Sequence, residues 1–240
     1  IHLNRFKKVV ISRKEEIKLP NFNLIKTYQS LLQKYPTAMV YGWFHPKVGL
    51  WMGATPELLC KVANNHFSTV ALAGTQFAED HKKVVWSQKE QIEQQLVTDF
   101  IVDELKSAIQ NLTISNPYSA KAGHLWHIKT DIEGEISTES SLEKIIQKLH
   151  PTPAVCGYPK NSAKDFILQN EAYHREFYTG YLGEINSNST TELFVNLRCM
   201  QVENNIISIF VGGGITKDSS PEKEWEETVA KAKTMKNVLL

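Results

Sequence analysis

Short segments rich in valine, isoleucine, leucine and aromatic residues alternate along the chain with glycine, proline and asparagine. This pattern is typical of β-strands separated by turns. We expect strands at residues 7–12, 38–44, 49–53, 58–62, 67–73, 125–132, 180–185, 193–202 and 206–211. The last two should form a hairpin across residues 203–205, and the closely spaced segments between residues 38 and 73 should be antiparallel.

The hydrophobic period changes in the segment from residue 87 to residue 111. Apolar side chains recur there at about every third or fourth position, at Ile92, Leu96, Phe100, Ile101, Leu105 and Ile109. That spacing predicts an amphipathic helix of about six turns. Shorter helices are expected at residues 141–149 and 163–173. A last helix is expected after Ser220, which can cap it, with Pro221 at its first position.

Several strands followed by a long helix, twice over, indicate the α+β class with antiparallel sheet. The 240 residues contain no repeat, low-complexity block or Gly/Ser linker, so we expect a single domain over residues 1–240. The chain does not begin with methionine, as would be the case for a fragment of a longer protein.

Composition and charge exclude several classes of protein. The formal net charge is +1 and no basic stripe stands out, so a nucleic-acid partner is not expected. The three cysteines form no CxxC pair, which argues against a zinc site and for a reducing compartment. No apolar run reaches about 18 residues and no signal peptide is recognisable, so we expect no membrane association and a cytoplasmic location.

The last predicted helix carries a polar stripe that allows two interpretations. Glu224, Glu227 and Lys231 follow one another at helical spacing, beside an apolar stripe that includes Trp225 and Ala232 and is expected to face the core. The pattern alone favours a solvated face with an ion pair between Glu227 and Lys231. The alternative is a pair of carboxylates for a hard cation such as Mg²⁺, with a lysine for an anionic ligand.

Two glycine-containing strand ends are candidates for backbone contacts with a ligand. Residues 212–214 are three consecutive glycines, which expose N–H groups and permit close approach. They match neither of the nucleotide-binding patterns GxxxxGK(S/T) and GxGxxG. A bulge or tight turn is the simpler explanation. Gly74 and Thr75 also end a predicted strand, and a turn is the simpler explanation there as well.

Three further charged residues occupy positions that are unusual for charges. Glu93 lies beside the apolar stripe of the long helix, and Glu57 follows Pro56 where a strand begins. Lys8 shares a strand face with Phe6 and Val10, so it is either edge protection or a base whose pKa is lowered by burial. His150, between Leu149 and Pro151, indicates a shaped loop. The sequence contains neither HExxH nor GxSxG.

Taken in order, these pieces resemble the chorismate-binding enzymes. That family includes isochorismate synthases, salicylate synthases and the first components of anthranilate and aminodeoxychorismate synthases. The resemblance covers nearly the whole chain and is carried by KVVISR (8–13), GATPELL (53–59), ALAGT (71–75), KEQIE (89–93), WHI (126–128), LHPTPAV (149–155), REFYTG (175–180), LR (197–198), GGGI (212–215) and SP (220–221) followed by Glu224, Glu227 and Lys231. Each motif alone is weak, but this many in the family's order is specific.

The resemblance implies two large antiparallel sheets packed as a sandwich, with helices outside and one catalytic site in a cleft. It implies Mg²⁺ held by Glu93 and Glu227, with Glu224 acting through water. Positions that hold the carboxylates of chorismate are matched by Tyr178, Arg198, Gly212, Gly214 and Lys231. Positions beside the ring are matched by Gly74, Thr75 and His150. Without the cation, the clustered carboxylates should raise the pKa of one of them.

Two departures from the family pattern stand out. Full-length members carry an additional N-terminal segment, and without its strands a sheet edge should be exposed. The arginine-glycine-aromatic stretch of many members reads Arg175-Glu176-Phe177 here.

Two positions distinguish the branches of the family. Ala73 stands where enzymes with a lysine nucleophile have lysine, and Lys8 stands where amine-using branches usually have glutamine. The prediction is therefore an isochorismate synthase of menaquinone or siderophore biosynthesis, in which Lys8 activates water for C2 and Glu57 protonates the leaving C4 hydroxyl. A salicylate synthase, which also eliminates pyruvate, is the main alternative. Anthranilate synthase component I would need a glutaminase subunit, which we do not expect. A non-catalytic chorismate-binding protein is disfavoured, because Lys8, Glu57, Glu93 and Glu227 are all intact.

Overall fold

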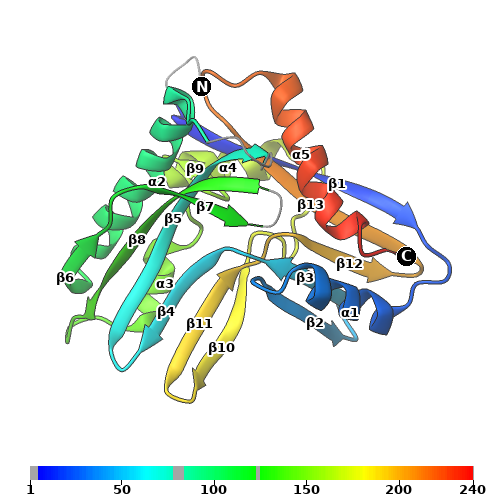
Figure 1. Ribbon diagram of the computed structural model, residues 1–240, viewed down its shortest axis with the longest axis horizontal. Helices are drawn as coiled ribbons and strands as arrows, with labels where there is room; N and C mark the ends of the chain where they lie inside the picture. Colours follow the sequence, from blue (N-terminus) through cyan, green and yellow to red (C-terminus); the bar gives the residue numbers. More distant parts are fainter. Residues whose placement is uncertain (1–4, 78–83, 123–124, 240) are drawn as a thin grey trace.

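The structure is a computed structural model that describes residues 5–77, 84–122 and 125–239. Over this part of the chain it has two antiparallel sheets and five helices, which confirms the predicted α+β class (Figure 1). The six-stranded sheet has the order β2 (Met39–His45), β3 (Gly49–Thr55), β12 (Cys199–Glu203), β13 (Ile206–Ile215), β1 (Lys8–Lys18) and β9 (Gly157–Tyr158). The seven-stranded sheet has the order β10 (Tyr181–Ser187), β11 (Thr190–Val195), β4 (Leu58–Ala63), β5 (His66–Phe77), β8 (Leu125–Ile136) and β6 (Ile109–Ile114), with β7 (Tyr118–Ala122) also paired to β8.

The helices bury an apolar face of each sheet. They are α1 (Leu24–Lys34), α2 (Gln88–Leu105), α3 (Leu142–Leu149), α4 (Lys160–Asn170) and α5 (Pro221–Lys236). In the seven-stranded sheet, Phe67 and Ile132 form one core with Ile101 of α2 and Ile145 of α3. In the six-stranded sheet, Met52 and Ile209 form another core with Leu31 of α1 and Met235 of α5. Among the residues described, no helix is long and apolar enough to cross a membrane.

Two short connections from one sheet to the other lie next to each other, and we call them the crossings. Residues 56–57 lead from β3 to β4, and residues 196–198 lead from β11 to β12. Backbone hydrogen bonds hold the crossings together: the Val195 N–H donates to the Glu57 carbonyl (2.9 Å), and the Ala54 N–H donates to the Arg198 carbonyl (3.0 Å). The single strand predicted at residues 193–202 was therefore wrong. Residues 193–195 belong to β11 and residues 199–202 belong to β12, which are in different sheets.

Other predicted elements were correct in type but differed in extent. The long helix ends at Leu105 rather than at residue 111, because Ile109 begins β6. The hairpin at residues 203–205 is confirmed, with Asn204 and Asn205 at φ of 49° and 63° in its turn. The sequence patterns did not reveal α1, β6, β7 or β9.

Two details of the last helix also differ from the prediction. The Ser220 hydroxyl donates to the Glu222 carboxylate (2.8 Å) instead of capping the backbone. Trp225 does not face the core: it is 58% exposed, and its ring lies 4.4 Å from the Arg13 guanidinium.

Candidate active site

A cavity of about 470 Å³ opens where the two sheets meet, and it gathers nearly all of the predicted site residues. It is lined by Lys8, Glu57, Ala73, Gly74, Thr75, Glu93, Tyr178, Arg198, Gly212, Gly214, Glu224, Glu227 and Lys231. These residues come from β1, β5, β13, α2, α5, the two crossings and the loop before β10. Segments far apart in sequence thus form one site.

The crossings contribute a carboxylate and a guanidinium. Glu57 lies directly between β3 and β4. Burial raises the pKa of Glu57 from 4.5 to about 7, although the nearby charges of Lys8, Arg198 and Lys231 oppose the shift. Because no ion pair neutralises Glu57 within the described ranges, its carboxyl group can hold a proton near neutral pH.

Arg198 and Tyr178 present polar groups to the cavity that no other described side chain engages. Arg198 adopts a left-handed backbone conformation with φ of 47°, which is uncommon for a residue other than glycine. Burial lowers the pKa of its guanidinium, which nevertheless stays charged. In the described part of the chain neither the Arg198 guanidinium nor the Tyr178 hydroxyl has a hydrogen-bond partner, although both line the cavity. An arginine and a tyrosine left free in this way suit an anionic ligand.

Lys8 lies on β1, buried against the glycine strand β13. Its side chain is 3% exposed, and its ammonium group lies 2.7 Å from a Glu93 carboxylate oxygen. Pairing of Val10 with Gly214 brings β1 and β13 together at this point. A Cβ atom at Gly214 would lie 2.7 Å from Lys8 Cε and 2.9 Å from Glu93 Oε1. The glycine at position 214 therefore makes room for this ion pair.

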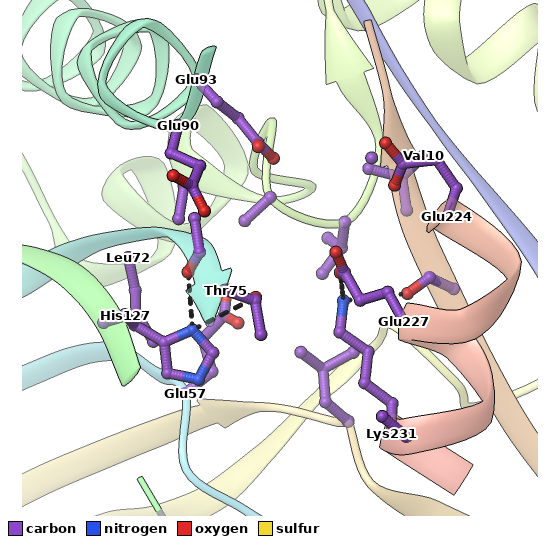
Figure 2. A pocket seen from close by; sticks show the side chains of 18 of the residues that line it. Val10, Glu57, Leu72, Thr75, Glu90, Glu93, His127, Glu224, Glu227 and Lys231 are labelled. Atoms are coloured by element: carbon purple, nitrogen blue, oxygen red, sulfur yellow. Dashed lines mark hydrogen bonds and ion pairs between the residues drawn. The ribbon is translucent and has the colours of Figure 1, made fainter. Parts of the chain in front are cut away.

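Helix α5 places its polar stripe on the cavity wall that faces α2 (Figure 2). Glu224 and Glu227 of this stripe each pair with a lysine. Lys231 lies 2.5 Å from Glu227 and also donates to the Gly212 carbonyl (3.1 Å). Glu224 is buried, and Lys89 reaches it from α2 at 2.6 Å. Burial by itself would raise the pKa of Glu227, but Lys231 and Arg198 lower it below the ordinary value. Glu227 is therefore not the metal-binding candidate whose pKa was expected to rise.

A β-bulge shapes the side of the cavity formed by β5 and β8. The register between these strands shifts after Ala73, and Gly74 in the bulge has φ of 71°. The His127 ring on β8 faces the bulge, with Nδ1 2.9 Å from the Gly74 carbonyl and 3.4 Å from the Thr75 hydroxyl (Figure 2). Burial lowers the pKa of His127 to about 4, so the imidazole is neutral and Nδ1–H donates to the carbonyl.

Of the histidines that the structure describes, His127 lines the cavity and His150 does not. His150 Nε2 lies 2.8 Å from the Thr179 carbonyl, and its ring packs edge-on against Tyr181. Sequence reasoning gave His127 no role, although it lies in the quoted WHI stretch. Only the pairing of β8 with the bulged strand β5 shows that it faces the cavity.

Lys89 and Glu90 are two further lining residues that sequence reasoning missed. Ser87 caps α2, and the Glu90 carboxylate accepts from the Ser87 N–H (2.8 Å), forming a capping box. The serine followed three residues later by glutamate was a readable signal for this helix start. It fixes the start of α2, whose first two turns carry Lys89, Glu90 and Glu93.

The cavity suits a hard divalent cation in its chemistry. Glu90 and Glu93 project from α2 and face Glu224 and Glu227 of α5 across the cavity (Figure 2). Carboxylate oxygens are preferred by Mg²⁺, which keeps several waters and so needs few protein ligands. Within the described ranges, no three His, Cys, Asp or Glu side chains already form a cluster that could hold a metal. A cation would thus have to replace the lysines that now pair with these carboxylates.

The fold and the site together define an enzyme-like cavity for a small acidic molecule. The family model described as "Chorismate binding enzyme" matches residues 1–240. The chain therefore belongs to the chorismate-binding enzymes.

Curated relatives and solved structures agree with that assignment. Isochorismate synthase EntC of Escherichia coli is 33% identical over 199 residues, which cover 79% of this chain and 51% of the relative. The vibriobactin-specific isochorismate synthase of Vibrio cholerae is 30% identical over 98% of this chain and 62% of its own length. A putative 2,3-dihydroxybenzoate-specific isochorismate synthase, DhbC from Bacillus anthracis, superposes with a TM-score of 0.91 at 28% identity, over 99% of this chain and 68% of that one.

The fold also extends to anthranilate synthase component I of Streptococcus pneumoniae. That structure has a TM-score of 0.86 and 22% identity, over 98% of this chain and 54% of its own. The chain spans about half the length of several curated relatives that it matches, 51% in the case of EntC.

Proposed function

We propose that this chain carries the catalytic machinery of an isochorismate synthase, which converts chorismate to isochorismate. The observation that carries the proposal is the meeting of Lys8 and Glu57 in one cavity with the free guanidinium of Arg198. A base and an acid beside an anion-binding group are what hydration at C2 with loss of the C4 hydroxyl requires. Relatives named as isochorismate synthases support the choice of reaction.

The proposed reaction divides the proton transfers between two residues. Lys8, once it is released from Glu93 and neutral, takes a proton from the water that adds to C2. Glu57 gives its proton to the departing C4 hydroxyl, which leaves as water while the ring double bonds shift. A pKa of about 7 leaves Glu57 protonated in a substantial fraction of molecules near neutral pH, as a general acid must be.

The substrate's two carboxylates would be held by the remaining polar groups. Arg198 and Tyr178 are free to bind one carboxylate, and Lys231 and the backbone at Gly212 and Gly214 also line the cavity. Gly212 lies beside Tyr178, because a Cβ atom there would be 3.0 Å from the Tyr178 hydroxyl. The neutral His127, held by the Gly74 carbonyl, would lie beside the ring together with Thr75. Ala73 is 8% exposed and presents only a methyl group, which leaves space for water near the ring.

We further propose that Glu93, Glu224 and Glu227 hold Mg²⁺ in the working enzyme. The bound cation would neutralise a substrate carboxylate in a cavity whose described lining already contains six carboxyl groups against four lysines and one arginine. Metal and chorismate should then strengthen each other's binding, as linkage requires.

Titration calorimetry tests the metal proposal. Chorismate affinity should fall when Mg²⁺ is chelated, and Glu93→Gln or Glu227→Gln should abolish that dependence. Lys231→Ala should weaken chorismate binding while leaving metal binding nearly intact, because Lys231 meets the anion. Equal chorismate affinity with and without Mg²⁺ in the parent protein would contradict the proposal.

One product assay tests the reaction itself. Chorismate and Mg²⁺ are incubated with the protein, with and without ammonium, and products are separated by chromatography. Isochorismate in both samples supports the proposal, and the product would then serve menaquinone or siderophore synthesis. Salicylate would identify a salicylate synthase. Anthranilate formed only with ammonium would identify an amine-using enzyme that depends on a glutaminase partner.

The Ala73→Lys variant sharpens the same assay. An amine in place of the Ala73 methyl group should occupy the space proposed for water and suppress isochorismate formation. Formation at the parent rate would show that Ala73 does not face the reacting carbon.

A further inference from the structure

A buried ion pair lies directly behind the cavity wall. Arg175 Nε and Nη2 donate to the two carboxylate oxygens of Glu171 at 2.7 and 2.5 Å. The side chains are 14% and 5% exposed. Burial by itself would lower the pKa of Arg175, but the adjoining Glu171 carboxylate raises it. A buried pair of this kind is often no more stable than apolar residues of similar size, so stability alone explains it poorly.

The pair joins segments that are far apart in the sequence. Arg175 also donates to the backbone carbonyls of Val155 (2.9 Å) and Val10 (2.8 Å). Glu171 accepts from both the backbone N–H and the hydroxyl of Ser12, at 2.8 Å each. Strand β1, the loop before β9 and the loop before β10 are thereby fixed to one another.

Each of these three segments lines the cavity next to its point of attachment. Val10 and Val155 are themselves lining residues, and Lys8 lies two positions before Val10 on β1. Tyr178 follows Arg175 by three residues, and its N–H donates to the Arg175 carbonyl (2.8 Å). The Arg175 hydrogen bonds are therefore made at the backbone that carries the site.

Tyr178 itself is held on two sides. The Arg175 guanidinium lies 6.0 Å from the centre of its ring, and the ring stacks on Phe210 at 5.7 Å with an interplanar angle of 20°. Phe210 in turn stacks on the fully buried Trp51 at 5.2 Å. With the ring restrained in this way, the direction of its hydroxyl depends on the backbone that Arg175 fixes.

We propose that Arg175 is a positioning residue, which aims the Tyr178 hydroxyl at a substrate carboxylate by fixing the loop before β10 to β1 and Val155. The inference rests on the proposed function, since it assumes that Tyr178 binds chorismate. An arginine is required because one guanidinium reaches Glu171, Val155 and Val10 at once, which a lysine ammonium cannot reproduce with the same geometry.

A double-mutant cycle on chorismate affinity, measured by titration calorimetry, tests the inference. Arg175→Lys should weaken binding by about 10-fold in the parent protein. In the Tyr178→Phe background, where the hydroxyl is already absent, the same change should weaken binding by less than about 3-fold. Equal effects in both backgrounds would overturn the inference, because a merely structural role does not depend on the Tyr178 hydroxyl.

Leu31→Ala serves as the stability-matched control. Leu31 is fully buried between α1 and the six-stranded sheet, so its truncation lowers the melting temperature without touching the cavity. Its chorismate affinity should stay within about 2-fold of the parent value. If Arg175→Lys does not fold, Glu171→Gln combined with Arg175→Met removes both charges together and supports the same cycle.

The outcomes separate this inference from the proposed function. A parent protein that binds chorismate but forms no isochorismate overturns the reaction, while the binding cycle still decides the role of Arg175. Additive effects together with isochorismate formation overturn only the inference.

Discussion

The crossings and the helical walls of the cavity differ in whether their charged side chains form ion pairs. At the crossings, residues 56–57 and 196–198, Glu57 and Arg198 have no ion-pair partner in the described part of the chain. On the walls, formed by α2 and α5, Glu224 pairs with Lys89 and Glu227 pairs with Lys231. Burial thus moves the pKa of Glu57 up, whereas lysine and arginine neighbours move the pKa of Glu227 down.

This difference separates two tasks that a site for an acidic substrate must perform. An unpaired, buried carboxyl group can carry a proton, and an unpaired guanidinium can receive an anion. Paired carboxylates are already compensated, so they remain ionised and can exchange a lysine for a cation. The crossings are therefore suited to reaction and recognition, and the walls to charge compensation.

The largest effect should come from removing the acid or the base. Glu57→Gln and Lys8→Ala should each lower turnover by about 100-fold or more, the usual scale for a general acid or base. Chorismate affinity should change far less. Glu226→Gln, also at the cavity but on α5, is the matched control and should retain most of the activity. Near-normal isochorismate formation by Lys8→Ala would contradict water activation by this residue.

The pH dependence of stability should distinguish the two kinds of carboxyl group. Folding raises the pKa of Glu57 from 4.5 to about 7, so the folded protein keeps a proton that the unfolded chain releases. Stability should therefore fall as pH rises from about 4.5 to about 7, by roughly 2 kcal/mol once partial solvent contact reduces the full effect of the shift.

Glu57→Gln should consequently raise the free energy of unfolding at pH 8 and flatten this slope, as measured by urea denaturation. Glu227→Gln should instead lower the free energy of unfolding at pH 8. A lowered pKa contributes stability above pH 4.5 that is lost on acidification, and the amide leaves Lys231 without its partner. Loss of stability at pH 8 in both variants would contradict the opposite pKa shifts of Glu57 and Glu227.

A smaller kinetic effect should follow from crowding the ion pair between Lys8 and Glu93. Gly214→Ala places a methyl group against Lys8 Cε and Glu93 Oε1, both at the ends of flexible side chains. These can move at little cost in stability, but the base is then displaced, and kcat/KM should fall by about 10-fold. Gly213→Ala is the control, because its Cβ would meet Glu224 Oε2 at an ordinary 3.5 Å. Equal kinetics in the two variants would show that the Lys8 position is not critical.

The residues on the walls were easier to predict than those at the crossings. Helical spacing placed Glu224, Glu227 and Lys231 on one stripe, and the structure keeps them together at the cavity. Arg198 could be recognised only by resemblance, because the apolar pattern runs through residues 193–202 and hides the passage between sheets. The interruption between β11 and β12 includes a left-handed backbone at Arg198, and no local sequence signal predicted it.

The two histidines, His150 and His127, also show that sequence patterns do not reveal which residues meet across the two sheets. His150 attracted attention because two prolines follow it, at positions 151 and 153, yet it packs against Tyr181 and the Thr179 carbonyl. His127 lies in an unremarkable strand, and its place in the cavity depends on the bulge in a strand more than fifty residues away. Periodicity predicts the face of one element, whereas a site built across two sheets depends on register between elements.

The smallest expected effect concerns strain beside the site rather than in it. Glu176 has φ of 50°, at the position where many family members have glycine, and its side chain is exposed. Glycine adopts this conformation without strain, so Glu176→Gly removes about 1 kcal/mol of strain from the folded state. Glycine also makes the unfolded chain more flexible, so the net gain in the free energy of unfolding should be smaller than that. Activity should be unchanged, because Glu176 does not line the cavity. Arg198→Gly relieves the same kind of strain at a crossing but should lose chorismate binding. Urea denaturation and calorimetry on both variants make the comparison, and lost chorismate affinity in Glu176→Gly would show that its left-handed backbone, too, serves the site.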